Sequence, residues 1–217
     1  MDNGKRAGGT KKKARRRRTR KTGIHFNLPI QLNSRYALIA GAALVLILVL
    51  IFGIRSCGAS HKNPERVVKE LIESYANGKE RKVKDCYGAK KNTPDELQAE
   101  IDATFKYFKA HNPQELIIES CEALYQEKNL TYVYIIYKLQ LENGQEYPCI
   151  STYMTQLRDD KYYVLSPAEV TEEMSEQAAT AYAKFMTTNT YKNYVTDYET
   201  FIKKNPGYEE KIAGKVS

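Results

Sequence analysis

Residues 132–157 read YVYIIYKLQLENGQEYPCISTYMTQL, and this stretch decides the fold. Val, Ile and Tyr are frequent in it and alternate with a period of two, the pattern of half-buried strands. Asn143-Gly144 divides the stretch, and this pair suits a two-residue type I′ turn, in which both residues have positive φ. We therefore predict two antiparallel strands, residues 131–141 and 145–157, joined by that hairpin.

The same criteria predict one further strand on each side of the hairpin. Residues 116–125 form the earlier strand, and residues 162–165, which follow a turn at 158–161, form the later one. Four strands connected in this way are expected to form an antiparallel sheet.

Before the sheet, the apolar period changes to that of helices. Asn63 can cap a helix that begins at Pro64 and ends at Asn77-Gly78, and residues 79–87 predict a second short helical segment. A third helix is predicted to start from a capping box at residues 93–96 and to stop before His111. The apolar faces of the first and third helices consist of Val67, Val68, Leu71, Ile72 and Tyr75, and of Leu97, Ile101, Phe105 and Phe108.

After Pro167 the sequence is again helical. Two apolar faces recur at spacings of three and four, separated by residues 187–190. The second face is aromatic, and it either packs on the sheet or the first helix or forms an interaction surface. The two faces consist of Met174, Ala178, Ala181 and Phe185, and of Tyr191, Tyr194, Tyr198 and Phe201. Helices segregated from an antiparallel sheet define an α+β fold.

Residues 36–54, YALIAGAALVLILVLIFGI, contain no charged residue. As a helix this stretch would reach about 28 Å, close to the thickness of the hydrocarbon core of a bilayer. Two alternatives to a membrane span fit this stretch less well. A buried core helix would need apolar flanks, which the stretch lacks. A cleaved signal peptide would have a shorter apolar run followed by a small-residue cleavage site. We therefore predict a single transmembrane helix at residues 36–54.

The charges on the two sides of this stretch predict its orientation. Residues 1–35 hold twelve Lys and Arg and one acidic residue, whereas the remaining residues hold 22 basic and 25 acidic residues. Basic segments beside a span remain in the cytoplasm. The sequence therefore predicts a single-pass protein of the cell membrane, with a cytoplasmic N-terminus and an extracytoplasmic C-terminal domain.

The basic tail is expected to be disordered, because it has almost no apolar surface to bury. Its basic residues would attract anionic lipid, since the adjacent span holds them at the membrane. Contact with nucleic acid is the less favoured alternative, and a role in topology alone is the simplest one. The predicted lipid-binding residues are Lys11, Lys12, Lys13, Arg15, Arg16, Arg17, Arg18, Arg20 and Lys21.

These features predict five segments along the chain. They are a disordered basic tail (1–35), a transmembrane helix (36–54), a linker (55–62), an extracytoplasmic domain (63–167) and a C-terminal helical extension (168–217).

Three segments of the outer domain resemble the nuclear transport factor 2-like (cystatin-like cone) superfamily, especially its small membrane-anchored bacterial domains. They are NPERVVKELIESYANGK at 63–79, the hairpin at 132–157, and RDDKYYVLSP at 158–167. Such domains typically carry a Trp in the last strand, where this chain has Tyr162-Tyr163-Val164. The resemblance implies helices packed on a curved four-stranded antiparallel sheet, with a pocket between them. Some members of the superfamily are enzymes, and many only bind or assemble.

Searching the sequence for chemistry gives little. No group of His, Cys, Asp and Glu has metal-ligand spacing, and neither a phosphate-binding loop nor a nucleophile elbow is present, so we predict no cofactor, no metal and no catalytic residue. Cys86, Cys121 and Cys149 could form one of three disulfides or be buried as thiols, and Cys57 would be free or paired between molecules.

We therefore expect a bitopic envelope protein, not an enzyme, whose outer domain binds a small ligand or another envelope protein. An inner-membrane assembly subunit of a secretion or conjugation machine is an alternative, because such subunits resemble this layout of tail, span and domain. A pocket enzyme of isomerase or dehydratase type is another, and a sensor that relays an outer ligand to the basic tail is a third.

Overall fold

The computed structural model describes residues 59–216. The predicted basic tail, with its nine lipid-binding residues, the predicted span at 36–54 and Cys57 lie outside the described residues. Among the helices between residues 59 and 216, none is both long enough and apolar enough to cross a membrane. The helices are α2 (Pro64–Ala76), α3 (Glu80–Cys86), α4 (Asp95–His111), α5 (Glu172–Phe185), α6 (Asn189–Lys204) and α7 (Tyr208–Val216), with a 3-10 turn at Pro167–Glu169.

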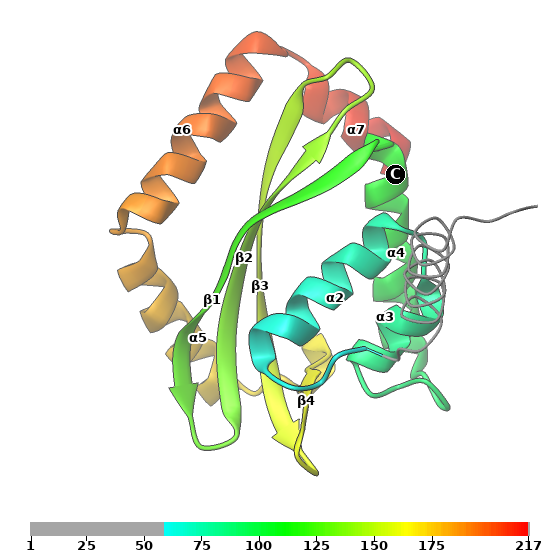
Figure 1. The fold of residues 1–217 in the computed structure, drawn as a ribbon, viewed down its shortest axis with the longest axis vertical. Helices are drawn as coiled ribbons and strands as arrows, with labels where there is room; N and C mark the ends of the chain where they lie inside the picture. The colour runs from blue at the N-terminus through cyan, green and yellow to red at the C-terminus, as the bar shows by residue number, and fades with distance from the viewer. Residues whose placement is uncertain (1–58, 217) are drawn as a thin grey trace, which may run out of the picture. The chain divides into compact units, whose positions relative to one another are not determined.

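The centre of the fold is a four-stranded antiparallel sheet in the order β1-β2-β3-β4 (Figure 1). The strands are β1 (Glu115–Glu127), β2 (Leu130–Gln140), β3 (Glu146–Arg158) and β4 (Lys161–Val164). Together with the helices that cover it, this sheet confirms the predicted α+β class. The pairing of β1 with β2 shifts between Ile118 and Ser120 and again between Ala123 and Tyr125. Such bulges bend a strand and increase its twist.

The central hairpin differs from the prediction in its turn. Leu141 donates its N–H to the Gln145 carbonyl, and Gly144 donates to the Leu141 carbonyl. The loop therefore has three residues, and only Gly144 has a positive φ, which is the type I turn followed by a left-handed Gly. The predicted type I′ turn at Asn143-Gly144 was wrong. The two consecutive residues with positive φ that such a turn requires are instead Asp159 and Asp160, between β3 and β4.

The first helix agrees with the prediction, and the third differs at its start. The Asn63 side chain accepts the Arg66 N–H at 2.8 Å, so it caps α2 as expected. Before α4, the Thr93 hydroxyl donates to the Ala89 carbonyl at 2.9 Å and caps nothing. The predicted capping box was therefore wrong, because the preceding turn uses the Thr93 side chain, and α4 begins at Asp95. It ends at His111, one residue later than expected, where Asn112 adopts the left-handed conformation.

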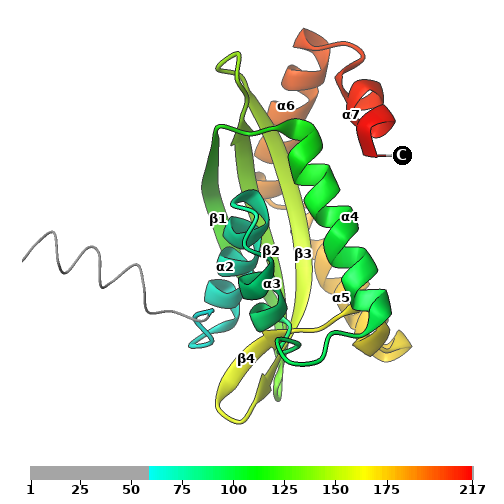
Figure 2. The ribbon, with the colours of Figure 1, turned by 90° about the vertical axis from the view of Figure 1, so that its right-hand side faces the viewer.

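The two faces of β2 are buried under different helices (Figure 2). On one face, its residues pack in the main core with α2, α3 and α4; on the other, Tyr134 and Ile136 pack with Phe185 of α5. This burial on both faces explains why the strand is apolar nearly throughout. The β2 residues in the main core are Val133, Ile135, Tyr137 and Leu139.

The aromatic face of α6 packs on the sheet, which is one of the two roles predicted for it. Phe201 is in the main core, whereas Tyr191 and Tyr194 pack around Tyr134 and Ile136. Lys138 of β2 supports this contact through an ion pair with Asp197 of α6, and it also pairs with Glu119 of β1 and Glu146 of β3. Beyond α6, helix α7 returns to α4, where the Lys215 ammonium donates to the Ala110 carbonyl at 2.9 Å.

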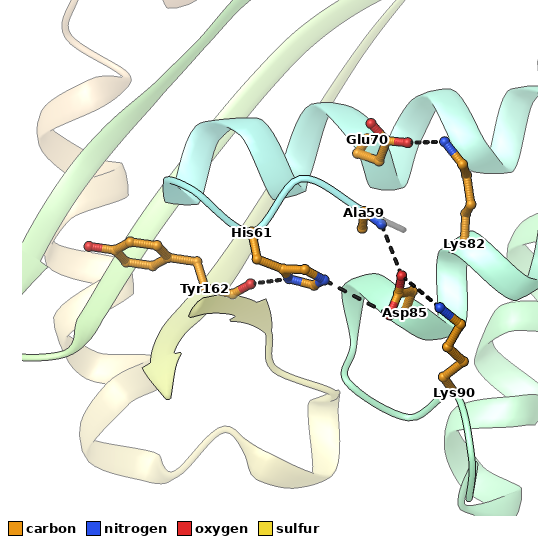
Figure 3. Close-up of polar contacts among 7 residues, drawn as sticks. All are labelled: Ala59, His61, Glu70, Lys82, Asp85, Lys90 and Tyr162. Atoms are coloured by element: carbon orange, nitrogen blue, oxygen red, sulfur yellow. Dashed lines mark hydrogen bonds and ion pairs between the residues drawn. The ribbon is translucent and has the colours of Figure 1, made fainter. Parts of the chain in front are cut away.

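The segment that leads into α2 is bound to the domain (Figure 3). Ala59 donates its N–H to the Asp85 carboxylate at 2.9 Å, and the His61 carbonyl accepts the Tyr162 N–H. The His61 ring nitrogen Nδ1 lies 2.6 Å from the Tyr162 carbonyl, and Lys90 pairs with Asp85 at 3.2 Å. Residues 59–62, the end of the predicted linker, are thus attached to both α3 and β4.

Gly88, which follows α3, allows a direct test of backbone packing. Its φ is +71°, and a Cβ there would lie 3.1 Å from the Tyr163 ring, whereas a Cβ on Gly144, at φ +77°, would meet nothing within 4 Å. A left-handed Ala costs about 1–2 kcal/mol in either case. We expect Gly88→Ala to lower the free energy of unfolding by about 1 kcal/mol more than Gly144→Ala, because of the added crowding. Urea denaturation would measure both, and equal losses would contradict the close approach of Tyr163.

Candidate functional site

A cavity of about 480 Å³ lies between α4 and β3, within the size range of small-molecule sites. We call it the α4–β3 cavity. It reaches the edge of the sheet, because β4 pairs only with Thr155–Arg158, and residues 146–154 of β3 have no other described strand on that side. Its lining residues are Glu100, Ala103, Thr104, Tyr107, Phe108, Tyr137, Tyr147, Pro148, Cys149, Ile150, Ser151, Tyr153 and Tyr194.

One helix face and one strand face position the polar groups of the cavity. Glu100, Thr104 and Tyr107 follow one another on α4 at spacings of four and three, so they share a face. From β3, alternate residues point to the same side of the sheet, and Tyr147 pairs with Leu139 of the main core. The alternate residues of β3 in the lining are Tyr147, Cys149, Ser151 and Tyr153.

Glu100 supplies the charge of the cavity. Of the described residues that line it, Glu100 alone is ionisable as an acid or base near neutral pH. Its oxygen Oε2 is buried and has no hydrogen-bond partner among the described residues. Burial raises the pKa of this carboxyl above its ordinary value, since a charged group is costly to remove from water. A ligand that supplied a partner to this oxygen would offset that cost.

Tyrosine hydroxyls make up most of the remaining polar lining. Burial raises the pKa of Tyr107, Tyr137, Tyr147, Tyr153 and Tyr194, so each keeps its proton at neutral pH. Protonated phenols can donate a hydrogen bond, and their rings offer apolar and π surface. The lining therefore combines one acid, several hydroxyl donors and several aromatic rings.

The acid also acts on tyrosines behind the cavity. After burial, which is the main cause, the charge of Glu100 contributes to the raised pKa of Tyr75, which reaches about 12, and to the raised pKa of Tyr87. The Tyr75 hydroxyl is buried without a partner in the described part of the chain. The charge of Glu100 thus acts on phenols outside the cavity lining as well as within it.

The nine sequence-predicted site residues all lie in the tail, outside the described residues. The three described cysteines, Cys86, Cys121 and Cys149, are buried free thiols, and burial raises the pKa of each. Among residues 59–216, no group of three or more His, Cys, Asp or Glu side chains could hold a metal.

Polar residues on one helix and one strand are a signal in the sequence for this cavity. Glu100, Thr104 and Tyr107 form a polar line beside the apolar face of their helix. Ser151 occupies an inward position of β3, between Cys149 and Tyr153. When polar residues of a helix and of a strand both face the expected core, a cavity between the helix and the strand is indicated.

His111 lies beside a second cavity, of about 380 Å³, between the end of α4 and α7. Its Nδ1 is 2.9 Å from the Tyr208 hydroxyl, and its Nε2 is buried without a described partner. Burial lowers the pKa of His111 from 6.5 to about 4, the Lys215 charge adds to this, and Glu209 opposes it. The folded protein therefore holds this imidazole neutral.

Acid should destabilise the fold through His111. Between pH 6.5 and about 4 the unfolded chain binds a proton here that the folded chain does not, so stability is lost as the pH falls through this window. The loss is expected to approach about 3 kcal/mol at pH 4. His111→Phe should lose less stability than the wild type over the same range, as measured by urea denaturation at pH 7 and at pH 4.5. Parallel losses in the two proteins would show that His111 does not titrate in this way.

Comparison with known proteins gives no family. No family model matches the chain, and no curated protein matches it. Three solved structures show a weak similarity to this chain. One is a SEC-C motif containing protein from Rhodopseudomonas palustris (14% identity, TM-score 0.35, 49% of this chain and 78% of that one). The others are a protein assigned as an NTF2-like transpeptidase from Campylobacter jejuni (18% identity, TM-score 0.33, 48% of this chain and 98% of that one) and one assigned as a calcium/calmodulin dependent protein kinase II association domain from Xanthomonas campestris (15% identity, TM-score 0.31, 51% of this chain and 93% of that one). All three TM-scores are below 0.5, and we base no conclusion on them.

Proposed function

We propose that this chain is a single-span membrane protein of the cell envelope whose outer domain binds a small ligand in the α4–β3 cavity. The observation that carries the proposal is Glu100, a partly buried side chain whose oxygen Oε2 is buried and unpartnered among the described residues, in a cavity lined by neutral tyrosines. Its membrane part rests on the uncharged stretch at 36–54 and on the basic residues before it. Helices over a four-stranded sheet with a cavity between them also suit the nuclear transport factor 2-like resemblance of the sequence.

The attachment of residues 59–62 supports this arrangement. In the proposal, these residues connect the membrane span to the domain. Because they are hydrogen-bonded to α3 and β4, the domain would begin within a few residues of the membrane surface.

Filling the cavity tests the binding function. Ala103 lines the cavity and is exposed, so Ala103→Trp can occupy its mouth without displacing the core. Asp102 is its exposed neighbour outside the lining, and Asp102→Trp is the matched control. A small-molecule library, screened by ligand-observed NMR against the full-length protein, should yield compounds that bind the wild type and Asp102→Trp but not Ala103→Trp. A library with no such compound would overturn the proposed function.

A second candidate is a pocket enzyme that transfers protons. The observation that favours it is Glu100 in a cavity lined by neutral phenols, with a pKa that burial raises, since a carboxyl of raised pKa can serve as a general acid or base. Exchange of the α-protons of small ketones in deuterated water would show this activity. The wild type should then catalyse exchange and Glu100→Gln should not, and a wild type without exchange on a broad ketone panel would leave the binding function alone.

A further inference from the structure

Resting on the proposed binding function, we infer that the ligand of the α4–β3 cavity is an organic cation, an amine or a quaternary ammonium group. The lining carries one carboxyl, and Lys, Arg and His are absent from its described residues. An anionic ligand would therefore meet a like charge without a compensating cation. A cation would instead be attracted by the Glu100 carboxyl of the lining.

The aromatic lining also fits a cation. Tyr107, Tyr137, Tyr147, Tyr153 and Tyr194 reach the cavity from α4, β2, β3 and α6, so rings surround it from several elements. Aromatic rings attract ammonium groups through their π faces, and the attraction increases where water is excluded. Sites for quaternary ammonium groups are commonly built from several such rings.

The test compares three probes of similar shape that differ in charge. Choline is the cation, 3,3-dimethyl-1-butanol is its neutral analogue, and 3,3-dimethylbutyrate is an anion of the same bulk. Binding to the full-length protein, in a maltoside detergent that carries no ammonium group, would be measured by calorimetry and ligand-observed NMR. We expect choline to bind the wild type about tenfold or more tightly than the alcohol, and the butyrate to bind most weakly.

Variants then assign the preference to individual groups. Glu100→Gln should weaken choline binding about tenfold and leave the alcohol unchanged, whereas Glu96→Gln, an exposed residue one turn earlier on α4, should change neither. Tyr194→Phe should retain choline binding, and Tyr194→Leu should lose about threefold or more, because only the first keeps the ring.

The outcomes separate this inference from the binding function. If the alcohol or the butyrate binds the wild type as well as choline does, the cation assignment is wrong and the small-ligand site stands. The cation assignment is also wrong, and the small-ligand site again stands, if choline does not bind but library compounds bind the wild type and not Ala103→Trp. If neither choline nor any library compound binds in the cavity, the proposed function itself fails. These comparisons use the wild-type protein, so they remain decisive even if Glu100→Gln does not fold.

Discussion

Replacing residues 36–54 with a Gly/Ser linker of the same length is expected to move the protein completely from the membrane fraction to the supernatant. Twelve of these nineteen residues are Leu, Ile, Val or Phe. Each favours insertion by about 0.3–0.6 kcal/mol at the centre of a span, so together they contribute about 4–7 kcal/mol. No other anchor of comparable strength is evident in the sequence, and the helices described at 59–216 include none that could cross a membrane.

The control for this experiment is removal of residues 1–21. The basic residues there add only surface attraction, which salt screens, so the shortened protein should stay in the membrane fraction after a high-salt wash. If the linker variant also stayed there after a carbonate wash, residues 36–54 would not be the anchor.

Leu71→Ala is expected to cause a large loss of folding stability in the domain described at 59–216. Leu71 is completely buried in α2, whose apolar side packs on β1, β2 and β4. Such a truncation removes buried methyl groups and leaves a cavity, which together cost about 2–5 kcal/mol. Because domains of this size are stable by about 5–15 kcal/mol, this is a large part of the total.

Leu116→Ala is the matched control, because Leu116 of β1 is only partly buried against the same core. It should lose less than half as much stability as Leu71→Ala. Urea denaturation followed by circular dichroism would measure both free energies of unfolding. Equal losses would show that Leu71 is not more tightly packed in the core than Leu116.

The sequence predicted the elements of the domain well, because the signals for them are local. The Asn63 cap and the apolar spacing of α2 each depend on residues a few positions apart, and the structure confirms both. Strand β2 also forms where it was predicted, but it is buried on both faces rather than half-buried. The failures arose where one residue could act in two ways. Thr93 bonds backward to Ala89 rather than capping α4, and Asn143-Gly144 forms part of a three-residue loop.

The cavity could not be predicted because it depends on contacts between distant segments. Glu100 and Ser151 are 51 residues apart, and only the packing of α4 along β3 brings them to one lining. Tyr194 joins them because α6 covers the opposite side of the sheet edge. Seventeen tyrosines in the chain also conceal the five that line the cavity, since residue type alone does not separate them from core tyrosines.

The most direct test of the whole account is the side of the membrane on which the cavity opens. A variant with Cys57→Ser and Ala103→Cys would carry one accessible thiol, at the mouth of the cavity, because Cys86, Cys121 and Cys149 are buried. A maleimide that cannot cross membranes should label this variant in intact cells, and a compound that fills the cavity should slow the labelling. Labelling that occurs only after the cells are broken would contradict an extracytoplasmic binding domain.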